Sequence, residues 1–150
     1  MGKVLNTDFS DFLIALKKNS VEYILVGGFA VIYHGYNRTT GDLDIWVKRT
    51  PENYKKIVKA FSEFGLSLFD MSEEKFINVG ENDVFTFGIP PVCIDVLTHV
   101  KGLDFDEAYK HSLETDFDSV VVRMIDIRDL LIAKRAANRL KDQDDIEHLK

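Results

Sequence analysis

Two aspartates separated by one residue, Asp42 and Asp44, constrain the fold of this chain more than any other feature. Successive side chains of a β-strand leave opposite faces, so these two should leave one face while Leu43, Ile45 and Val47 leave the other. Neighbouring carboxylates repel each other, and burial increases that cost. We therefore expect a cation to offset the pair, and hard oxygen ligands favour Mg²⁺ or Mn²⁺.

A glycine pair precedes this strand. The apolar and aromatic residues 23–26 predict a strand that ends at Gly27 and Gly28, and residues 29–33 predict a short helix that starts just after Gly28. Free backbone N–H groups and the positive dipole end at a helix start favour phosphate. Glycine has no Cβ, so a triphosphate can approach the backbone closely. The alternative is that the two glycines form only a tight turn.

Three motifs in this order resemble the nucleotidyltransferase superfamily of the DNA polymerase β type: the glycine pair, the Asp42-x-Asp44 pair, and a later strand carboxylate, Asp95. The closer resemblance is to small stand-alone bacterial and archaeal nucleotidyltransferases, including those of abortive-infection and toxin–antitoxin modules. It is carried by the Arg-Thr-Thr-Gly lead-in at 38–41 and by residues 139–146, which resemble an Arg-x-Lys-Asp-x-x-Asp element. The matching motifs extend over residues 23–146.

The resemblance implies a nucleotidyltransferase fold and Mg²⁺-dependent (or Mn²⁺-dependent) transfer of NMP from an NTP to a hydroxyl of an RNA end, a protein or a small molecule. It assigns Asp42 and Asp44 to two metal ions and Asp95 to the ion that lowers the pKa of the acceptor hydroxyl. Gly27 and Gly28 would hold the β- and γ-phosphates. The alternatives are a solvated strand end for Asp42 and Asp44 and an isolated polar residue for Asp95.

Basic residues are concentrated near the C-terminus, where Lys134, Arg135, Arg139 and Lys141 form the densest cationic run. One alternative is a solvated helix face, with cations placed favourably for the helix dipole. The resemblance favours binding of triphosphate or acceptor by Lys134, Arg139 and Lys141, and we expect Lys134 or Arg139 to border the pocket over the aspartate pair. Arg38 is either a further phosphate or acceptor contact or a surface cation of its loop.

Three further residues carry expectations of their own. Asp142 is expected to cap the last helix at its N-terminus, and Asp145 is expected to tether the basic residues. Cys93 alternates with core residues, which favours packing over a nucleophilic role.

Composition limits the function classes. A chain of 150 residues predicts one domain, residues 1–150. Its net charge of −6 argues against a broad electrostatic grip on nucleic acid. A single cysteine excludes an internal disulfide, and neither a Cys/His zinc spacing nor a signal peptide is present. No apolar run approaches the roughly 20 residues of a membrane helix, so we expect no membrane partner and a cytoplasmic location.

The periodicities predict the order helix–strand–helix–strand–helix–strand–strand–strand–helix–strand–helix–helix. This is an α/β (α+β) domain with a mixed sheet, with helices packed on one face and the C-terminal helices over the other. The three consecutive strands are expected at 67–69, 83–87 and 92–97. Trp46 shares a face with the aspartate pair and Leu97 shares one with Asp95, and the helix from Ile127 is expected to cover them.

Two functions remain open from the sequence. The first is the enzyme described above. The second is a catalytically silent, nucleotidyltransferase-like protein that binds a nucleotide or a partner, such as the other protein of a toxin–antitoxin pair. The complete set of three carboxylates favours the enzyme, whereas the lack of an obvious acceptor-binding domain favours the silent protein.

Overall fold

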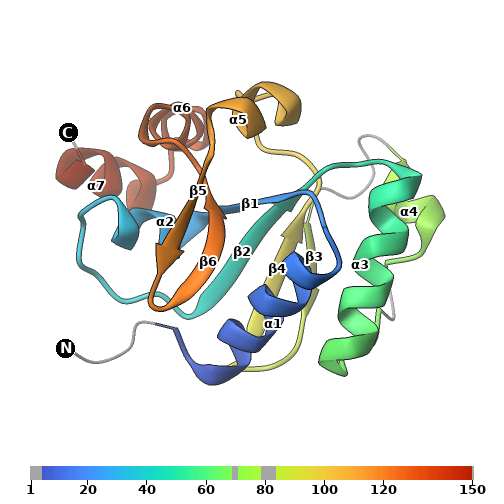
Figure 1. Ribbon diagram of the computed structural model, residues 1–150. Coiled ribbons are helices and arrows are strands. Elements are labelled where there is room, and N and C mark those ends of the chain that lie inside the picture. Colours follow the sequence, from blue (N-terminus) through green and yellow to red (C-terminus); the bar gives the residue numbers. More distant parts are fainter. Residues whose placement is uncertain (1–4, 69–70, 79–83, 150) are drawn as a thin grey trace.

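The computed structural model of the chain describes residues 5–68, 71–78 and 84–149. Within them, six strands form one mixed sheet in the order β3-β4-β2-β1-β6-β5 (Figure 1). The strands are β1 (Tyr23–Val26), β2 (Asp42–Val47), β3 (Val84–Phe87), β4 (Cys93–Leu97), β5 (Leu113–Phe117) and β6 (Val120–Met124). The helices are α1 (Thr7–Lys18), α2 (Gly27–Tyr33), α3 (Pro51–Phe64), α4 (Glu73–Ile77), α5 (Phe105–His111), α6 (Ile127–Ala137) and α7 (Leu140–Leu149).

Strand β2 lies inside the sheet, antiparallel to β1 and parallel to β4. The remaining pairs are β1 with β6, which is parallel, and β3 with β4 and β5 with β6, which are both antiparallel. The mixed α/β class predicted from the sequence is confirmed. Since β2 has a neighbour on each side, groups from β1 and β4 converge on its side chains.

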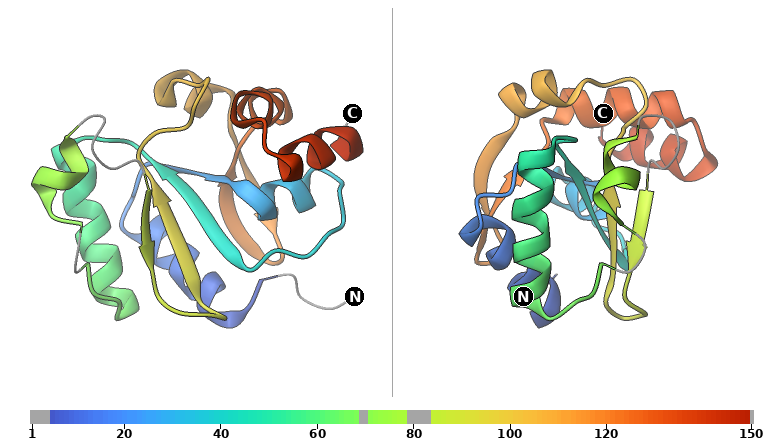
Figure 2. Two further views of the ribbon diagram at one scale, coloured as in Figure 1. Left: turned by 180° about the vertical axis from the view of Figure 1, so that it is seen from behind. Right: turned by 90° about the vertical axis from the view of Figure 1, so that its right-hand side faces the viewer.

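Helices cover both faces of the sheet (Figure 2). Helices α1 and α3 lie on one side, where the ring of Phe12 packs edge-on against Phe61 and Phe64, with 5.3 Å between centroids in each pair. Helices α5 and α6 lie on the other side, as expected for the C-terminal helices. No helix in the described part of the chain is both long enough and apolar enough to cross a membrane.

Strand β2 divides its side chains between these two layers. Leu43, Ile45 and Val47 are completely buried on the face opposite the aspartates. On the aspartate face Trp46 is also buried, but Phe105 of α5 packs edge-on against it at 5.2 Å. We expected the helix from Ile127 to cover Trp46. This expectation is corrected, because the aromatic ring that packs against Trp46 belongs to α5.

Polar residues cap the N-termini of α1 and α3. The Asn6 side chain accepts a hydrogen bond from the backbone of Phe9, and Thr50 caps α3 directly before Pro51. Gly65 ends α3 with a φ of 90°. These caps fix the lengths of the two helices that cover one face of the sheet.

Two strand assignments differ from the sequence-based prediction. Residues 67 and 68 are not in a strand, and residues 69 and 83 lie outside the described part of the chain. The sequence did not predict β5, which pairs with β6 across a turn at Asp118 and Ser119, with φ values of 54° and 71°. Strand β5 carries mostly polar, exposed residues at the edge of the sheet, so it has neither the alternation nor the glycine that usually indicate a hairpin.

Candidate active site

Three carboxylates lie on one face of two adjacent strands. In the parallel pairing of β2 with β4, Asp44 lies directly opposite Asp95 and Asp42 lies opposite Cys93. Because side chains alternate along a strand, Asp42, Asp44 and Asp95 all leave the sheet on the face that α5 and α6 cover. The structure thus brings together the three acidic residues that the motifs singled out.

Asp44 lies at the centre of this group and is electrostatically strained. Burial, a hydrogen bond shared with Asp95, and the negative charges of Asp95 and Asp42 together raise the pKa of Asp44 to about 7. Asp95 also accepts a hydrogen bond of 2.8 Å from the Thr86 hydroxyl. Asp44 therefore keeps its proton until about neutral pH, where a bound cation would otherwise balance its negative charge.

The donor set has the chemistry of a Mg²⁺ or Mn²⁺ site, since every candidate ligand is a carboxylate oxygen. Among the described residues, no three His, Cys, Asp or Glu side chains converge as a ready-made metal cage. The fit rests instead on Asp44, whose charge is not balanced by any cation in contact with it within the described part of the chain and would be balanced by a divalent ion in place of its proton.

The glycine pair fits closely against this strand. Val26, the last residue of β1, pairs with Asp44, and Gly27 follows it with a φ of +71°. A Cβ on Gly27 would lie 2.0 Å from the Asp44 carboxylate, and a Cβ on Gly28 would lie 2.2 Å from the Thr40 hydroxyl. Helix α2 starts at Gly27 itself, two residues earlier than predicted from the sequence, and no side chain caps it at Val26. Backbone N–H groups are therefore presented beside Asp44.

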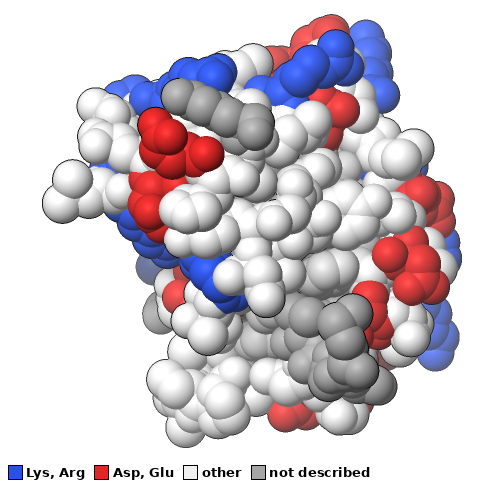
Figure 3. Space-filling view, turned by 90° about the vertical axis from the view of Figure 1, so that its left-hand side faces the viewer, with Lys and Arg blue, Asp and Glu red and all other residues white. Residues whose placement is uncertain are grey.

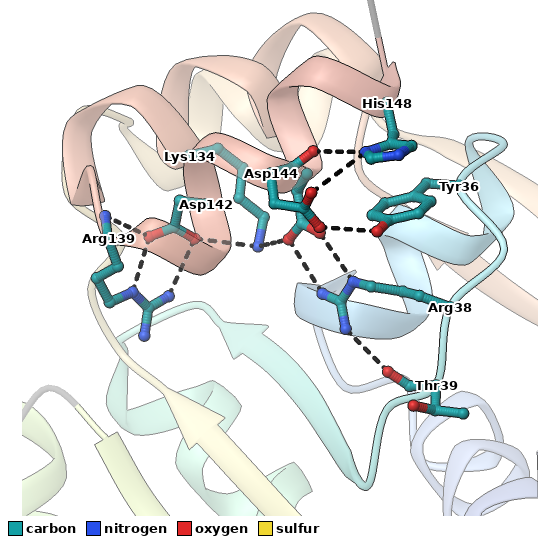
Figure 4. A network of polar contacts seen from close by, with 9 residues as sticks. Tyr36, Arg38, Thr39, Lys134, Arg139, Asp142, Asp144 and His148 are labelled. Carbon is teal, nitrogen blue, oxygen red and sulfur yellow. Dashed lines mark hydrogen bonds and ion pairs between the residues drawn. The ribbon is translucent and has the colours of Figure 1, made fainter.

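Opposite the carboxylates lies an ion-pair network that we call the α7 clamp (Figure 4). Its two acids, Asp142 and Asp145, are completely buried. The Lys134 ammonium bridges them, at 3.3 Å from Asp142 and 2.9 Å from Asp145. Arg139 binds Asp142 at 2.7 Å, and Arg38 donates to both oxygens of Asp145 at 2.8 and 3.0 Å. The clamp ties the lead-in to β2 onto α6 and α7.

These pairings reverse the usual effect of burial. Burial alone would raise the pKa of Asp142 and Asp145, but hydrogen bonds from the cations outweigh it and lower both pKa values. Asp142 also accepts from the backbone N–H of Arg139 at 3.0 Å. It is the third residue of α7, so the expectation that it is the N-cap is corrected: it reaches back to the residue before the helix. The tethering role expected for Asp145 is confirmed.

A cleft of about 180 Å³ separates the clamp from the carboxylates. Asp44, Lys134 and Arg139 all line it, so both cations named in the sequence analysis border the pocket over Asp44. Asp42 is not among the lining residues. Lys141 is exposed, and its charge acts to lower the pKa of Asp44, which places it near the same carboxylate.

The comparisons agree with this geometry. A family model described as a nucleotidyltransferase of unknown function (DUF6036) matches residues 7–150. The chain belongs to this family. It is a nucleotidyltransferase, as the motifs predicted, and no match was found among curated proteins.

Solved structures share the nucleotidyltransferase fold. The lincomycin-bound lincosamide antibiotic adenylyltransferase LnuA has a TM-score of 0.64 and 15% identity over 99% of this chain and 98% of that one. A candidate nucleotidyltransferase from Thermotoga maritima has a TM-score of 0.63 and 14% identity over 93% and 88%. The antibiotic-resistance factor ANT(2'')-Ia, solved in solution, has a TM-score of 0.62 and 14% identity over 95% and 80%. At these identities the likeness shows the fold alone.

One contact that supports the site of this nucleotidyltransferase was not predicted from the sequence. Tyr36 donates to Asp144 at 2.7 Å and stacks on His148, with ring centroids 3.9 Å apart. This contact holds the lead-in to β2 against α7 beside the clamp (Figure 4). No motif signals it, because a tyrosine and a histidine 112 positions apart in the sequence carry no common pattern.

Cys93 also differs from its prediction. It is partly exposed on the carboxylate face, opposite Asp42 in the β2–β4 pairing, and does not belong to the core. Burial and the charges of Asp42 and Asp95 raise the pKa of its thiol, so it is a poor nucleophile there. Its two-residue spacing from Asp95 is the signal that would have placed it correctly.

Proposed function

We propose that this nucleotidyltransferase uses Mg²⁺ or Mn²⁺ to transfer NMP from an NTP to a hydroxyl of a small-molecule acceptor. The observation that carries the proposal is the grouping of Asp42, Asp44 and Asp95 on one sheet face, with Gly27 packed against Asp44. Carboxylates that lie side by side on adjacent strands are suited to hold divalent ions between them.

Each residue has a separate part in this proposal. Asp42, Asp44 and Asp95 would hold the ions, which when bound offset charge at the attacking and leaving oxygens and lower the pKa of the acceptor hydroxyl. The absence of side chains on Gly27 and Gly28 lets the β- and γ-phosphates approach the backbone at the start of α2. Asp95, oriented by Thr86, would align the acceptor hydroxyl for in-line attack.

The clamp cations would act at a distance. Lys134 and Arg139 border the cleft while their charged groups are held by Asp142 and Asp145. They would therefore stabilise a bound triphosphate through their field, together with the exposed Lys141, whose charge also acts on Asp44. Arg38 binds Asp145 through two nitrogens, which supports an anchoring role for it over direct contact with phosphate.

Charge favours a small acceptor over RNA. The chain has a net charge of −6, and Arg38, Lys134 and Arg139 are already engaged in ion pairs. Figure 3 shows the side of the molecule that carries α7: uncharged side chains cover most of it, and the basic side chains are scattered and interrupted by acidic ones, so those of the described residues form no continuous basic patch. Such a surface gives little grip on a phosphate backbone. Two of the structural neighbours are named for antibiotic adenylylation or resistance, which further supports a small hydroxyl compound.

Pyrophosphate release with Mg²⁺, measured over the four common NTPs and a panel of hydroxyl compounds, a short RNA and a protein, tests the proposal. Asp44→Asn is expected to weaken NTP binding strongly, whereas Asp95→Asn is expected to abolish release and leave NTP binding mostly intact. Lys56→Ala is the control and should change neither. Equal NTP affinity with and without a chelator would exclude the metal site.

NTP binding without release for every acceptor would instead favour the catalytically silent protein. A toxin–antitoxin partner and a cytoplasmic location stay predictions from the sequence.

A further inference from the structure

The cleft beside Asp44 has a mostly apolar lining, which the binding of a triphosphate does not explain. We call it the α6 cleft. Apart from Gly27, it is lined by four charged residues and by seven apolar ones. Its apolar surface comes from the sheet and the chain after β4 on one side and from α6 on the other; the residues used below are Leu97, Val100, Leu130, Ala133 and Ala137.

Its size limits the occupant. The cleft holds about 180 Å³, whereas pockets for drug-sized ligands run from roughly 300 to 1,000 Å³. An apolar cavity of about 150 Å³ in another protein binds benzene, so this cleft has room for one flat ring system. A larger acceptor molecule would have to lie mostly outside it.

Its polar rim indicates which ring system that is. Two carboxylates, Asp44 and Asp142, and two cations, Lys134 and Arg139, line the cleft together with Gly27. In the proposed function the triphosphate and its metal ions are held at Gly27 and Asp44, so a ligand that joins a flat ring to a triphosphate complements an apolar slot that opens beside these two residues. We propose that the α6 cleft binds the nucleobase of the NTP; this inference rests on the proposed function and adds a subsite to it.

The lining also sets how selective this subsite is. No Ser, Thr, Asn, Gln or Tyr side chain is among the described residues that line it. Of the charged groups, Lys134, Arg139 and Asp142 are bound to one another. Pockets that hydrogen-bond a substrate reject analogues strongly, whereas apolar pockets reject them weakly. The α6 cleft therefore accepts a purine through its shape and discriminates little between ATP and GTP.

Calorimetry on the full chain with Mg²⁺ tests this subsite, with ATP, GTP and inorganic tripolyphosphate as probes. ATP and GTP should bind the wild type within about tenfold of each other, and both should bind more tightly than tripolyphosphate. Ala133→Leu, which fills the cleft, should weaken ATP about tenfold or more and leave tripolyphosphate unchanged. Ala137→Leu, at the exposed end of α6, should do the same to a smaller extent and is the variant to use if Ala133→Leu does not fold.

Arg135→Leu is the matched control, since it adds the same side chain to the exposed side of α6, outside the cleft. It should change ATP and tripolyphosphate by the same factor. The inference is overturned if filling the cleft leaves the ratio of ATP to tripolyphosphate affinity unchanged, if the wild type prefers one purine by over a hundredfold, or if only the acceptor KM rises. The proposed function itself fails separately if the wild type binds neither ATP nor tripolyphosphate with Mg²⁺.

Discussion

Aspartates on the two sides of the α6 cleft have opposite electrostatics. On the sheet, Asp44 lies against Asp95 and Asp42, and its pKa is raised to about 7. On α7, Asp142 and Asp145 are even more deeply buried, yet both pKa values are lowered. The difference is the partners: the α7 acids have three cations between them, whereas the sheet acids face one another.

This difference separates charges that stabilise the fold from charges that the proposed function assigns to metal binding. Completely buried carboxylates are tolerated in α7 because each is hydrogen-bonded to two cationic side chains. The sheet carboxylates have no such compensation, which is typical of groups reserved for a metal or a substrate. The clamp thus fixes Lys134 and Arg139 at the rim of the cleft without neutralising Asp44.

Removal of a sheet carboxylate should separate activity from stability. Asp44→Asn is expected to lower the rate of pyrophosphate release by about 10³-fold or more, because charge stabilisation at the reacting phosphate depends on this group. The free energy of unfolding of the metal-free protein should stay the same or rise, since a like-charge contact is lost. Steady-state rates and urea unfolding measure the two quantities, and a parallel loss of both would contradict the comparison.

Removal of a clamp carboxylate should instead lower the free energy of unfolding. Asp145→Asn should cost about 3–5 kcal/mol in urea unfolding, because it leaves the buried Lys134 and part of Arg38 unpaired. The double variant Asp145→Asn with Lys134→Met should recover much of that loss, since it removes the stranded charge. If the single variant unfolds like the wild type, the clamp does not stabilise the fold.

The two groups of aspartates should also respond oppositely to pH in the absence of metal. The pKa of Asp44 is higher in the folded protein than in the unfolded chain, so its contribution to stability falls as pH rises from about 4 to about 7. The pKa values of Asp142 and Asp145 are lowered on folding, so their contribution is present above about 4 and is lost as pH falls through their folded values.

Thermal unfolding from pH 3 to 8 measures both effects. Asp44→Asn should remove the decline between about pH 4 and 7 while keeping the acid loss. Mg²⁺ at pH 7.5 should raise the melting temperature of the wild type and have little effect on this variant. A decline that persists unchanged in Asp44→Asn would mean that another group titrates there.

The sequence predicted the sheet side of the comparison far better than the α7 side. Strand alternation alone placed Asp42 and Asp44 on one face, because it depends only on near neighbours along the chain. The pairing of Arg38 with Asp145 joins residues 107 positions apart, and no local pattern reports it.

The edge strand β5 and the position of Cys93 were not predicted for related reasons. Strand β5 exists because β6 offers it a hydrogen-bonding edge, and its exposed residues need no apolar alternation. Cys93 was placed in the core because its neighbours are apolar, although its own face is set by its spacing from Asp95. Pairing with β6 decided the first case and alternation of side chains along β4 decided the second, and the composition of the neighbouring residues predicted neither.

The smallest expected effect concerns Lys141, a cation that acts on Asp44 without being part of the clamp. It is exposed and makes no salt bridge within the described residues, yet its charge acts on Asp44. Lys141→Gln should therefore weaken NTP binding only roughly two- to fivefold and leave the melting temperature unchanged. Lys17→Gln is the matched control, because Lys17 is an exposed lysine that pairs with Glu114.

Ionic strength sharpens this last test. The Debye length falls from about 10 Å at 0.1 M salt to about 3 Å at 1 M, so a contribution made through the field should vanish at high salt. Calorimetric titration of the NTP at both salt concentrations should then show wild type and Lys141→Gln converging. A loss of affinity that persists at 1 M would instead mean that Lys141 contacts the triphosphate directly. In that case Lys141 would belong with the ligand-binding groups on the sheet side, although it stands on the same helix as Asp142 and Asp145.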